Sequence, residues 1–453
     1  MDESSVTHAI WRVVRGVLLA VLGVIMALVL LELGVRVLGL APPPESPGWF
    51  WQGPNPETGW NHIPGATGRW FNPRHEYDVD VTISSQGLRD VEHEVPKPAD
   101  VFRILILGDS YVEGIRVPLE QTFGKRLEDR LNQAGLPIRF EVVLAGVSAW
   151  GTDQELLWFR DEGVRYEPDL VLLGFFPGND FLNNSEALET ANFGGIRKPF
   201  FHLENGELVL KYYPFDPATV PASETDRSPG TEEAAVTPSE LESAPFASWR
   251  PWLHENLALY RYTIPLVRDA VPGLARAMVR WGLIEPGQEE IDAALPADYI
   301  PVAYGVYRRP PDQVWQDAFT LTNAIIRSMD REVAEQSGAR LAVVVLTAQE
   351  QVYTDLWNSL LDRYAPMREV DWDLEQPNRI VHGILDGANI PYVDLLPTFR
   401  TQAEGPSELL HFRHDGHWTA AGEQLAADTI YDFLVTNRLV PIAGSATEPA
   451  DAP

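Results

Sequence analysis

The chain contains no cysteine. Disulfide bonds, thiolate catalysis and zinc sites with cysteine ligands are therefore excluded. Basic residues are also scarce, because 35 lysines and arginines stand against 65 aspartates and glutamates, and the formal net charge is -30. A surface with this excess of negative charge repels phosphate backbones, so we do not expect the protein to bind nucleic acid.

Signals for a bound cofactor or metal ion are missing as well. The sequence has no glycine-rich phosphate loop of the Walker type. His411, His414 and His417 follow one another at intervals of three and would share one face of a helix. Glycine and proline residues around them favour a loop instead, so the three histidines do not predict a zinc site. We expect no cofactor and no metal.

One long apolar segment is present, at residues 13–40, where nearly every residue is Val, Leu, Ile, Ala or Gly. A membrane-spanning helix needs roughly 20 such residues. Arg12 and Arg15 lie at its start, and Glu32 and Arg36 interrupt its far end. The last two lie one helical turn apart and can pair. The segment therefore predicts a transmembrane helix.

The charges around this segment predict its orientation. Arg12 and Arg15 favour a cytoplasmic location for residues 1–12 and translocation of the rest of the chain across the membrane. A cleaved signal peptide is the alternative, because residues 39–41 resemble a small-x-small cleavage site. The charges at Glu32 and Arg36 just before that site favour an uncleaved, single-pass anchor. A buried soluble helix is disfavoured, because its two faces do not differ in polarity.

The rest of the chain divides into several parts that differ in amino-acid composition and in hydrophobic pattern. A Pro-rich stretch after the apolar segment predicts a stiff spacer, and a region rich in Pro, Ser, Thr, Ala and Glu lacks the apolar residues to fold alone. We expect a spacer at 41–58, a small β-rich lobe at 59–100 with a strand at 78–84, a main domain at 101–440 with an insertion at about 191–300, disorder at 214–245, and a disordered tail at 441–453.

The main domain alternates buried-strand and helix patterns. Short apolar runs that end in glycine or polar residues predict strands, and longer amphipathic segments between them predict helices. This alternation predicts a parallel sheet in a three-layer α/β/α sandwich. Residues 249–284 are apolar and predicted helical, as an insertion or a lid. We expect strands at 102–108, 140–144, 170–176, 340–347 and 392–396, and helices at 120–134, 152–162, 312–338, 378–388 and 420–437.

Polar residues follow the first three of these strands. Gly108-Asp109-Ser110 ends the first, Gly146 the second and Gly178-Asn179-Asp180 the third, whereas a histidine-rich segment at 411–418 precedes the last helix. Because the carboxyl ends of parallel strands share one edge, we expect these residues to lie close together. Singly, each has an ordinary interpretation as a turn, a helix cap or a surface histidine.

Together these residues supply what nucleophilic acyl transfer needs: a hydroxyl, a base, a carboxylate that orients the base, and donors for the oxyanion. Ser110 is the predicted nucleophile and His417 its base. Asp415 can accept a hydrogen bond from the other imidazole nitrogen. The predicted oxyanion donors are the backbone N–H groups of Ser110 and Gly146 and the side-chain amide of Asn179.

In this order the motifs resemble those of the SGNH hydrolase superfamily, named for its Ser, Gly, Asn and His. Gly108-Asp109-Ser110 matches the first motif and Gly146 the second. Gly178-Asn179-Asp180 matches the third with one residue fewer between Gly and Asn, and Asp415-Gly416-His417 matches the last. The resemblance covers 101–190 and roughly 341–434.

The last motif departs from the common superfamily pattern, which is Asp-x-x-His followed by Pro. Here the spacing is Asp-x-His, Trp418 replaces the proline, and Gly422 keeps its place five residues after His417. This variant resembles polysaccharide O-acetyltransferases of the alginate-modifying type. Glu408 with His411 would preserve the longer spacing, although no suitable glycine follows, and stays open as a minor alternative.

The resemblance implies an extracytoplasmic serine esterase or O-acyltransferase. Its partners would be an acylated carbohydrate or other small ester and, through the apolar helix, the membrane. The acyl group would be small, such as acetyl, and carried by a cell-surface or secreted polysaccharide. Two alternatives remain open: a non-catalytic, anchored glycan-binding or assembly factor, and a membrane-associated lipase or lysophospholipase with residues 249–284 as its lid.

Overall fold

The protein is described from a computed structural model, which covers residues 3–41, 50–72, 76–135, 138–220, 244–286, 296, 298–405 and 408–441. The chain divides into two compact units. The first unit comprises Met1–Glu45 and Gly230–Leu295, and the second comprises Ser46–Pro229 and Pro296–Pro453. Most of the disorder predicted at 214–245, and of the tail predicted at 441–453, lies outside the described residues.

A five-stranded parallel sheet forms the centre of the second unit. Its strands are nearly continuous runs of buried apolar residues, as expected where helices cover both faces of a sheet. The spatial order is β11-β10-β7-β5-β6. The strands are β5 (Val101–Gly108), β6 (Arg139–Gly146), β7 (Leu170–Phe175), β10 (Arg340–Val345) and β11 (Tyr392–Asp394), which confirms the five predicted strands.

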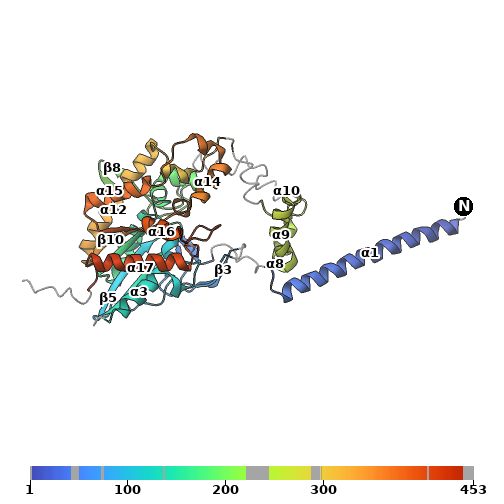
Figure 1. Ribbon diagram of the computed structural model, residues 1–453, viewed down its shortest axis with the longest axis horizontal. Helices are drawn as coiled ribbons and strands as arrows, with labels where there is room; N and C mark the ends of the chain where they lie inside the picture. Colours follow the sequence, from blue (N-terminus) through green and yellow to red (C-terminus); the bar gives the residue numbers. More distant parts are fainter. Residues whose placement is uncertain are drawn as a thin grey trace, which may run out of the picture. The chain divides into compact units, whose positions relative to one another are not determined.

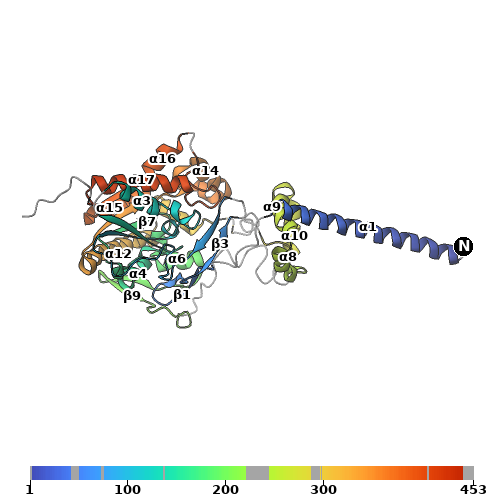
Figure 2. The same ribbon diagram turned by 90° about the horizontal axis from the view of Figure 1, so that it is seen from below.

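Helices cover both faces of this sheet, as Figure 2 shows. Alternate residues of β5 point to opposite faces: Ile104 and Ile106 pack in one apolar cluster, and Leu105 and Leu107 in the other. The predicted three-layer α/β/α sandwich is therefore confirmed. One face carries α3 (Phe123–Gln133), α16 (Leu396–Ala403) and α17 (Ala420–Thr436), and the other carries α4 (Thr152–Asp161), α12 (Gln313–Ser337) and α15 (Gln376–Ala388).

The strand order reverses next to β5. From β5 the chain crosses to β6 on one side of it and then to β7 on the other. In doubly wound sheets of this kind, ligands bind outside the carboxyl ends of the strands at such a reversal. Ser110 follows β5 with one residue between them, so the topology alone places it at this point of the sheet.

The N-terminal lobe consists of two antiparallel pairs, β1 (Gln52–Asn55) with β2 (Gly59–His62) and β3 (Thr67–Phe71) with β4 (Asp78–Thr82). The strand predicted at 78–84 is thus confirmed. The spacer predicted at 41–58 is wrong in its second half, which contains β1. Trp51 is fully buried and donates to Glu113 across 2.8 Å, so burial of its side chain packs this segment against the rest of the unit.

Glu113 connects the lobe to the helix that begins at Ser110. Its carboxylate is buried and accepts from Trp51, lies 2.8 Å from Nε2 of His62, and accepts from the hydroxyl of Ser148. Burial alone would raise the pKa of Glu113, but the hydrogen bond and charge of His62, with the bond from Ser148, lower it below its usual value. An ionised carboxylate therefore holds the lobe against the sheet.

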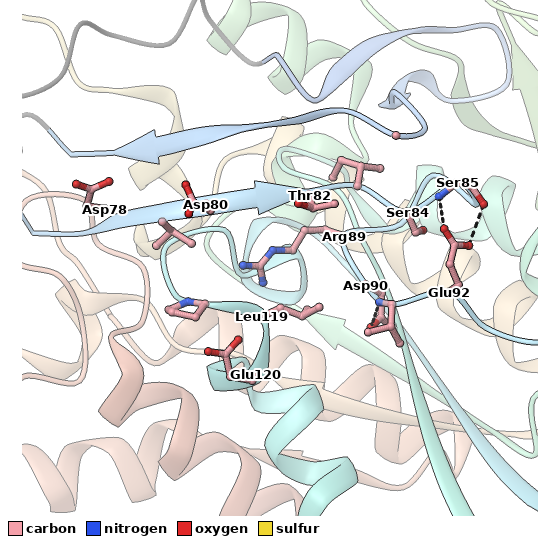
Figure 3. Close-up of a pocket in the computed structure, with 15 residues that line it drawn as sticks. Asp78, Asp80, Thr82, Ser84, Ser85, Arg89, Asp90, Glu92, Leu119 and Glu120 are labelled. Carbon is pink, nitrogen blue, oxygen red and sulfur yellow. Dashed lines mark hydrogen bonds between the residues drawn. The ribbon is translucent and has the colours of Figure 1, made fainter.

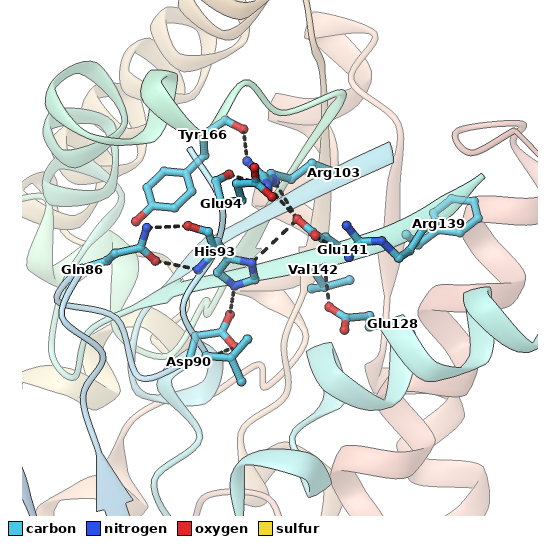
Figure 4. Close-up of polar contacts among 12 residues, drawn as sticks. Gln86, Asp90, His93, Glu94, Arg103, Glu128, Arg139, Glu141, Val142 and Tyr166 are labelled. Atoms are coloured by element: carbon cyan, nitrogen blue, oxygen red, sulfur yellow. Dashed lines mark hydrogen bonds and ion pairs between the residues drawn. The ribbon is translucent and has the colours of Figure 1, made fainter. Parts of the chain in front are cut away.

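The other end of the sheet is held by a buried arginine (Figure 4). Arg103 on β5 is fully buried and donates to Glu141 on β6 across 2.6 and 3.1 Å. It also donates to the carbonyl oxygens of Tyr166 and Glu94, across 2.8 and 2.9 Å. Three segments distant in sequence therefore depend on one guanidinium group.

We expect Arg103→Met to lower the free energy of unfolding of the second unit by about 3–5 kcal/mol, because it leaves one oxygen of a mostly buried carboxylate and two carbonyl groups without their arginine donor. Arg139→Met is the matched control. Arg139 also pairs with Glu141, but its side chain is 52% exposed, so its loss should cost only about 0–1 kcal/mol. Urea denaturation measures both, and equal effects would contradict the assignment.

The first unit contains α1 (Glu3–Val37), η3 (Ala247–Trp249), α8 (Arg250–Asn256), α9 (Ala258–Ala270) and α10 (Pro272–Arg280). Within α1, residues Val14–Val37 are long and apolar enough to cross a membrane, with a mean hydropathy of 2.7. The helical structure predicted at 249–284 is confirmed. Its contacts group it with α1 rather than with the sheet, as a short helical cluster beside the end of α1 (Figure 1).

Other elements of the second unit border the sandwich. A hairpin of β8 (Phe200–Glu204) and β9 (Glu207–Lys211) lies inside the predicted insertion, and the sequence patterns did not predict it. The remaining described helices are α2 (Ser110–Glu113), α5 (Asp180–Asn183), α6 (Glu186–Phe193), α13 (Gln349–Val352), α14 (Thr354–Arg363), η1 (Leu119–Gln121), η2 (Gly163–Tyr166), η4 (Val302–Tyr307) and η5 (Ala365–Glu369).

Candidate active site

Three predicted residues form one hydrogen-bonded chain at the carboxyl edge of the sheet. The hydroxyl oxygen of Ser110 lies 2.8 Å from Nε2 of His417. Nδ1 of the same imidazole lies 2.6 Å from Oδ1 of Asp415. Ser110 begins α2, and Asp109 caps that helix by accepting from the N–H of Tyr111. The structure therefore brings Ser110, His417 and Asp415 together as their motifs predict.

The segment 411–418 is a tight loop, as predicted, and not a helix. His411 and Trp418 face each other in an antiparallel bridge, and the N–H of Phe412 donates to the carbonyl oxygen of His417 across 2.8 Å. Gly416 has a φ of 87°, which only glycine adopts readily. This closed loop fixes the direction of the His417 ring.

Two unusual positions of the last motif have structural explanations. Trp418 is buried and its indole N–H donates to the hydroxyl of Thr347 across 3.3 Å, so it anchors the loop to the end of β10. At Gly422 a Cβ atom would lie 2.2 Å from the carbonyl oxygen of Leu410. The glycine five places after His417 is therefore required for α17 to approach the loop.

The alternative pair Glu408 and His411 is wrong. His411 is buried, and its Nε2 lies 3.3 Å from the hydroxyl and 3.4 Å from the carbonyl oxygen of Thr347. Burial lowers the pKa of His411 to about 3. Glu408 is exposed. A neutral histidine held by Thr347 packs the core beneath the loop and does not serve Ser110.

Asp415 has neighbours that the sequence did not reveal. The Tyr77 hydroxyl donates to its Oδ2 across 2.9 Å, and Nε of Arg116 forms an ion pair with its Oδ1 at 3.3 Å. Glu76 accepts from the N–H of Asp415 across 3.2 Å. Burial alone would raise the pKa of Asp415, but the hydrogen bond from His417, the charge of Arg116 and the bond from Tyr77 together lower it.

His417 is held neutral by its surroundings. Burial, followed by the positive charge of Arg116, lowers the pKa of His417 below its usual value, against the opposing hydrogen bond and charge of Asp415. The ring of Tyr111 packs on the imidazole at 4.9 Å between centroids, and its hydroxyl donates to the carbonyl oxygen of Gly416 across 3.2 Å. A neutral imidazole in a fixed position can accept the proton of a serine hydroxyl.

The predicted oxyanion residues lie beside the hydrogen-bonded series of Ser110, His417 and Asp415. The amide nitrogen of Asn179 donates to Oδ2 of Asp109 across 2.8 Å, and no side-chain bond caps α5, so Asn179 is not an Asx cap. Burial raises the pKa of Asp109 to about 6, against the bonds from Tyr111 and Asn179. Asp109 thus links the first and third motifs, a function that its place in the sequence did not indicate.

Gly146 ends β6 against α2. A Cβ atom there would lie 2.4 Å from the backbone nitrogen of Glu113, so the close packing of strand and helix requires glycine. The oxyanion functions of Ser110, Gly146 and Asn179 remain predictions.

A cavity of about 980 Å³ lies in the second unit, along β4 and the segments 84–92 and 118–120 (Figure 3). Ser110 and His417 are not among its lining residues. Its charged lining consists of Arg89 and five carboxylates, which are Asp78, Asp80, Asp90, Glu92 and Glu120. Within the described residues, no group of three or more His, Asp or Glu side chains is placed to hold a metal ion.

A serine, a histidine and an aspartate hydrogen-bonded at the carboxyl edge of a doubly wound sheet are the arrangement of an α/β serine hydrolase. Residues 309–448 match the family model described as "SGNH hydrolase-like domain, acetyltransferase AlgX". This part of the chain is therefore similar to an SGNH hydrolase-like domain, the class that the motifs predict. The matched residues include Asp415 and His417 and leave out Ser110.

Several solved structures are similar over most of their length. An acetyl xylan esterase named AlAXEase is 13% identical, with 73% of this chain and 98% of that chain covered and a TM-score of 0.34. A lipase/acylhydrolase from Enterococcus faecalis is 10% identical, with 74% and 96% covered and a TM-score of 0.33. An acetyl xylan esterase from Geobacillus stearothermophilus is 11% identical, with 74% and 96% covered and a TM-score of 0.32. No curated protein matches the chain.

Proposed function

We propose that the protein is an extracytoplasmic O-acyltransferase and esterase, which moves small acyl groups, such as acetyl, on a polysaccharide. The observation that carries this proposal is the hydrogen-bonded chain from Ser110 through His417 to Asp415. The description of the matching family favours acetyl transfer as the chemistry. The N-terminal apolar helix favours a site of action outside the cytoplasm.

The proposed reaction has two steps. His417 takes the proton of Ser110 while the serine oxygen attacks the ester carbonyl carbon. The tetrahedral oxyanion accepts hydrogen bonds from the N–H groups of Ser110 and Gly146 and from Asn179. Collapse of the intermediate expels the alcohol, which takes its proton from His417. A sugar hydroxyl, or water, then gives its proton to His417 and attacks the acyl-enzyme. The second intermediate releases the acylated sugar, or the free acid, and the oxygen of Ser110 takes the proton back from His417.

The groups around Asp415 suit this reaction. Asp415 must stay ionised to stabilise the imidazolium that forms when His417 takes the proton. Tyr77 and Arg116 donate to or pair with its carboxylate, which lowers its pKa and keeps it charged. They act through Asp415 and are positioning residues.

Intact mass spectrometry tests the proposal directly. The full chain incubated with a small acetyl ester should gain one acetyl group, and peptide mapping should place it on Ser110. Adding a neutral oligosaccharide should discharge the adduct faster than water does and yield acetylated sugar. An adduct that only water discharges would leave an esterase, and no adduct with turnover intact would contradict the serine mechanism.

Removing the charge of Arg116 should move the acid limb of the kcat/KM profile to higher pH. The base must be neutral, so the rate falls as the pH drops through the pKa of His417. Arg116 lowers this pKa, so Arg116→Met raises it and the rate falls at a higher pH. Arg69→Met is the control, because Arg69 pairs with Asp78 and both side chains are exposed. An acid limb that stays in place, or moves to lower pH, would contradict the role of Arg116.

The charge of the protein predicts the kind of glycan that it accepts. The chain has 65 aspartates and glutamates against 35 lysines and arginines, and its formal net charge is -30. These charges repel a polyuronate and tolerate a neutral glycan. At low salt, kcat/KM for an acetylated neutral oligosaccharide should exceed that for an acetylated oligouronate by about tenfold, and the ratio should fall as salt screens the repulsion. A preference for the uronate would contradict this prediction.

A further inference from the structure

The apolar helix α1 is bound to the helices that follow η3 by its two charged residues. Oε1 of Glu32 accepts from the N–H of Ala258 across 3.0 Å, and Oε2 accepts from the N–H of Leu259 across 2.7 Å. These N–H groups open α9, whose own N-cap residue supplies no side-chain hydrogen bond. Arg36 donates to the carbonyl oxygen of Asn256 across 2.5 Å. Glu32 is thus the N-terminal cap of α9, supplied by α1.

The helical cluster has a small core of its own. Ala275, Val279 and Ile284 are buried against Tyr260 and Ile264, so α9 and α10 pack face to face. The large apolar side chains on the outside of the cluster have no such cover. Because the core is already complete, the exposed apolar residues are not needed for the internal packing of the cluster.

Exposed apolar residues are concentrated in this cluster. Residues 244–286 expose seven large apolar side chains, as many as the whole described part of the second unit. Trp249, Trp252 and Trp281 are 61%, 53% and 49% exposed. Among the described residues, the fourth exposed tryptophan is Trp11, at the start of α1. Tryptophan is enriched at both interfaces of a membrane, where its ring lies at the level of the headgroups.

The spacing of these features matches a bilayer. Trp11 and Glu32 are 21 positions apart on α1, which at about 1.5 Å per residue is about 32 Å. The hydrocarbon core of a bilayer is about 30 Å thick. If Trp11 marks one interface, Glu32 and the start of α9 lie at the other. The helical cluster is then attached to α1 at that interface, through the start of α9.

The charge of the cluster differs from that of the whole chain. Residues 244–286 contain five arginines and three carboxylates, in a chain with a net charge of -30. A local excess of arginine next to exposed tryptophan and leucine is the composition of a helix that lies in the plane of a membrane surface. It also attracts anionic headgroups.

We propose that α8, α9 and α10 form a membrane-surface platform that lies among the headgroups of the bilayer spanned by α1, with Glu32 and Arg36 fixing it to the anchor. The occupant of the apolar face is the lipid bilayer. This inference goes beyond the proposed acyl chemistry and rests only on α1 crossing the membrane. It gives the insertion a task other than covering the active site.

The absence of cysteine makes a direct test possible. The full chain is reconstituted in vesicles of phosphatidylcholine and phosphatidylglycerol, with one cysteine at a time labelled with a nitrobenzoxadiazole fluorophore. The test variants are Trp252→Cys and Trp281→Cys. Leu22→Cys in α1 is the positive control, and Gln336→Cys, at an exposed position of α12, is the negative control. Lipids with doxyl groups on the acyl chains should quench the labels at 252, 281 and 22 at least twofold, and the label at 336 not at all.

Each other outcome overturns the inference. Quenching at 22 without quenching at 252 and 281 would show that the cluster stays in water. No quenching at 22 would show that α1 does not cross the bilayer. Esterase activity is measured on every labelled sample, so a failure of the platform is distinguished from a failure of the proposed function.

Glu32→Leu tests the attachment separately. It removes the cap of α9 and keeps α1 apolar. Quenching at 252 should fall by at least half in this variant, whereas quenching at 22 should be unchanged. Equal quenching at 252 with and without Glu32 would show that α1 does not hold the platform, and would overturn that part of the inference.

Discussion

Ser110→Ala is expected to lower turnover of a small acetyl ester by about 10⁴-fold or more, because the oxygen that forms the acyl-enzyme is gone and His417 and Asp415 have no hydroxyl to activate. The change removes one partly exposed atom at the start of a short helix. It should therefore leave the fold intact. Steady-state hydrolysis of a chromogenic acetyl ester measures turnover, and circular dichroism measures the fold.

Ser359→Ala is the matched control for this experiment. Ser359 is exposed on α14 and donates to the carbonyl oxygen of Asp355, one turn earlier. Its activity should equal that of the unchanged chain. If Ser110→Ala keeps its turnover, or if the unchanged chain turns over no ester and Ser110→Ala still supports the cellular function, the catalytic proposal fails. A glycan-binding or assembly role would then replace it.

Loss of the base should be nearly as severe. We expect His417→Ala to lower kcat by about 10⁴-fold or more, because the serine hydroxyl is a weak nucleophile without a proton acceptor. Asp415→Asn should lower kcat by up to about 10⁴-fold, since an amide does not stabilise the imidazolium. Tyr77 and Arg116 do not replace Asp415. Tyr77 is a hydrogen-bond donor and Arg116 a cation, whereas the imidazole of His417 needs an anionic acceptor.

The two variants differ in their dependence on pH. Asp415 raises the pKa of His417, so the residual activity of Asp415→Asn should persist to lower pH than that of the unchanged chain. Arg116→Met moves the same limb to higher pH. His414→Ala is the control for His417→Ala, because it removes a neighbouring exposed imidazole from the same loop. Opposite shifts for Asp415→Asn and Arg116→Met would support the electrostatic arrangement, and shifts in one direction would contradict it.

The strands and the hydrogen-bonded chain could be predicted from the sequence for physical reasons. Strands buried on both faces are continuous apolar runs, which are visible without partners. Ser110 follows the end of such a strand, and His417 lies in the loop just before the last helix. In contrast, the bond between Tyr77 and Asp415 joins residues 338 positions apart. Neither residue belongs to a periodic pattern, so nothing local marks the contact.

Other differences have the same origin. The hairpin of β8 and β9 lies in an insertion whose polar residues hide the alternation of its strands. Trp51 lies close to several prolines, and these made the segment resemble a spacer. In the structure, the indole of Trp51 is buried and donates to Glu113. The contact between residues 244–286 and α1 depends on Glu32, which accepts from the N–H of Ala258. In the sequence, Glu32 indicated only an ion pair with Arg36 within the same helix.

The order of the elements along the chain also determines when the reactive serine is first activated. Ser110 and His417 are 307 positions apart, and the loop that carries His417 is held by the first turn of α17. The anchor α1 precedes both in the chain. During synthesis, Ser110 therefore emerges long before His417. If α1 is the export signal of the proposed enzyme, the nascent chain reaches the membrane before its proposed base is made, and esters of the cytoplasm are not exposed to an activated serine.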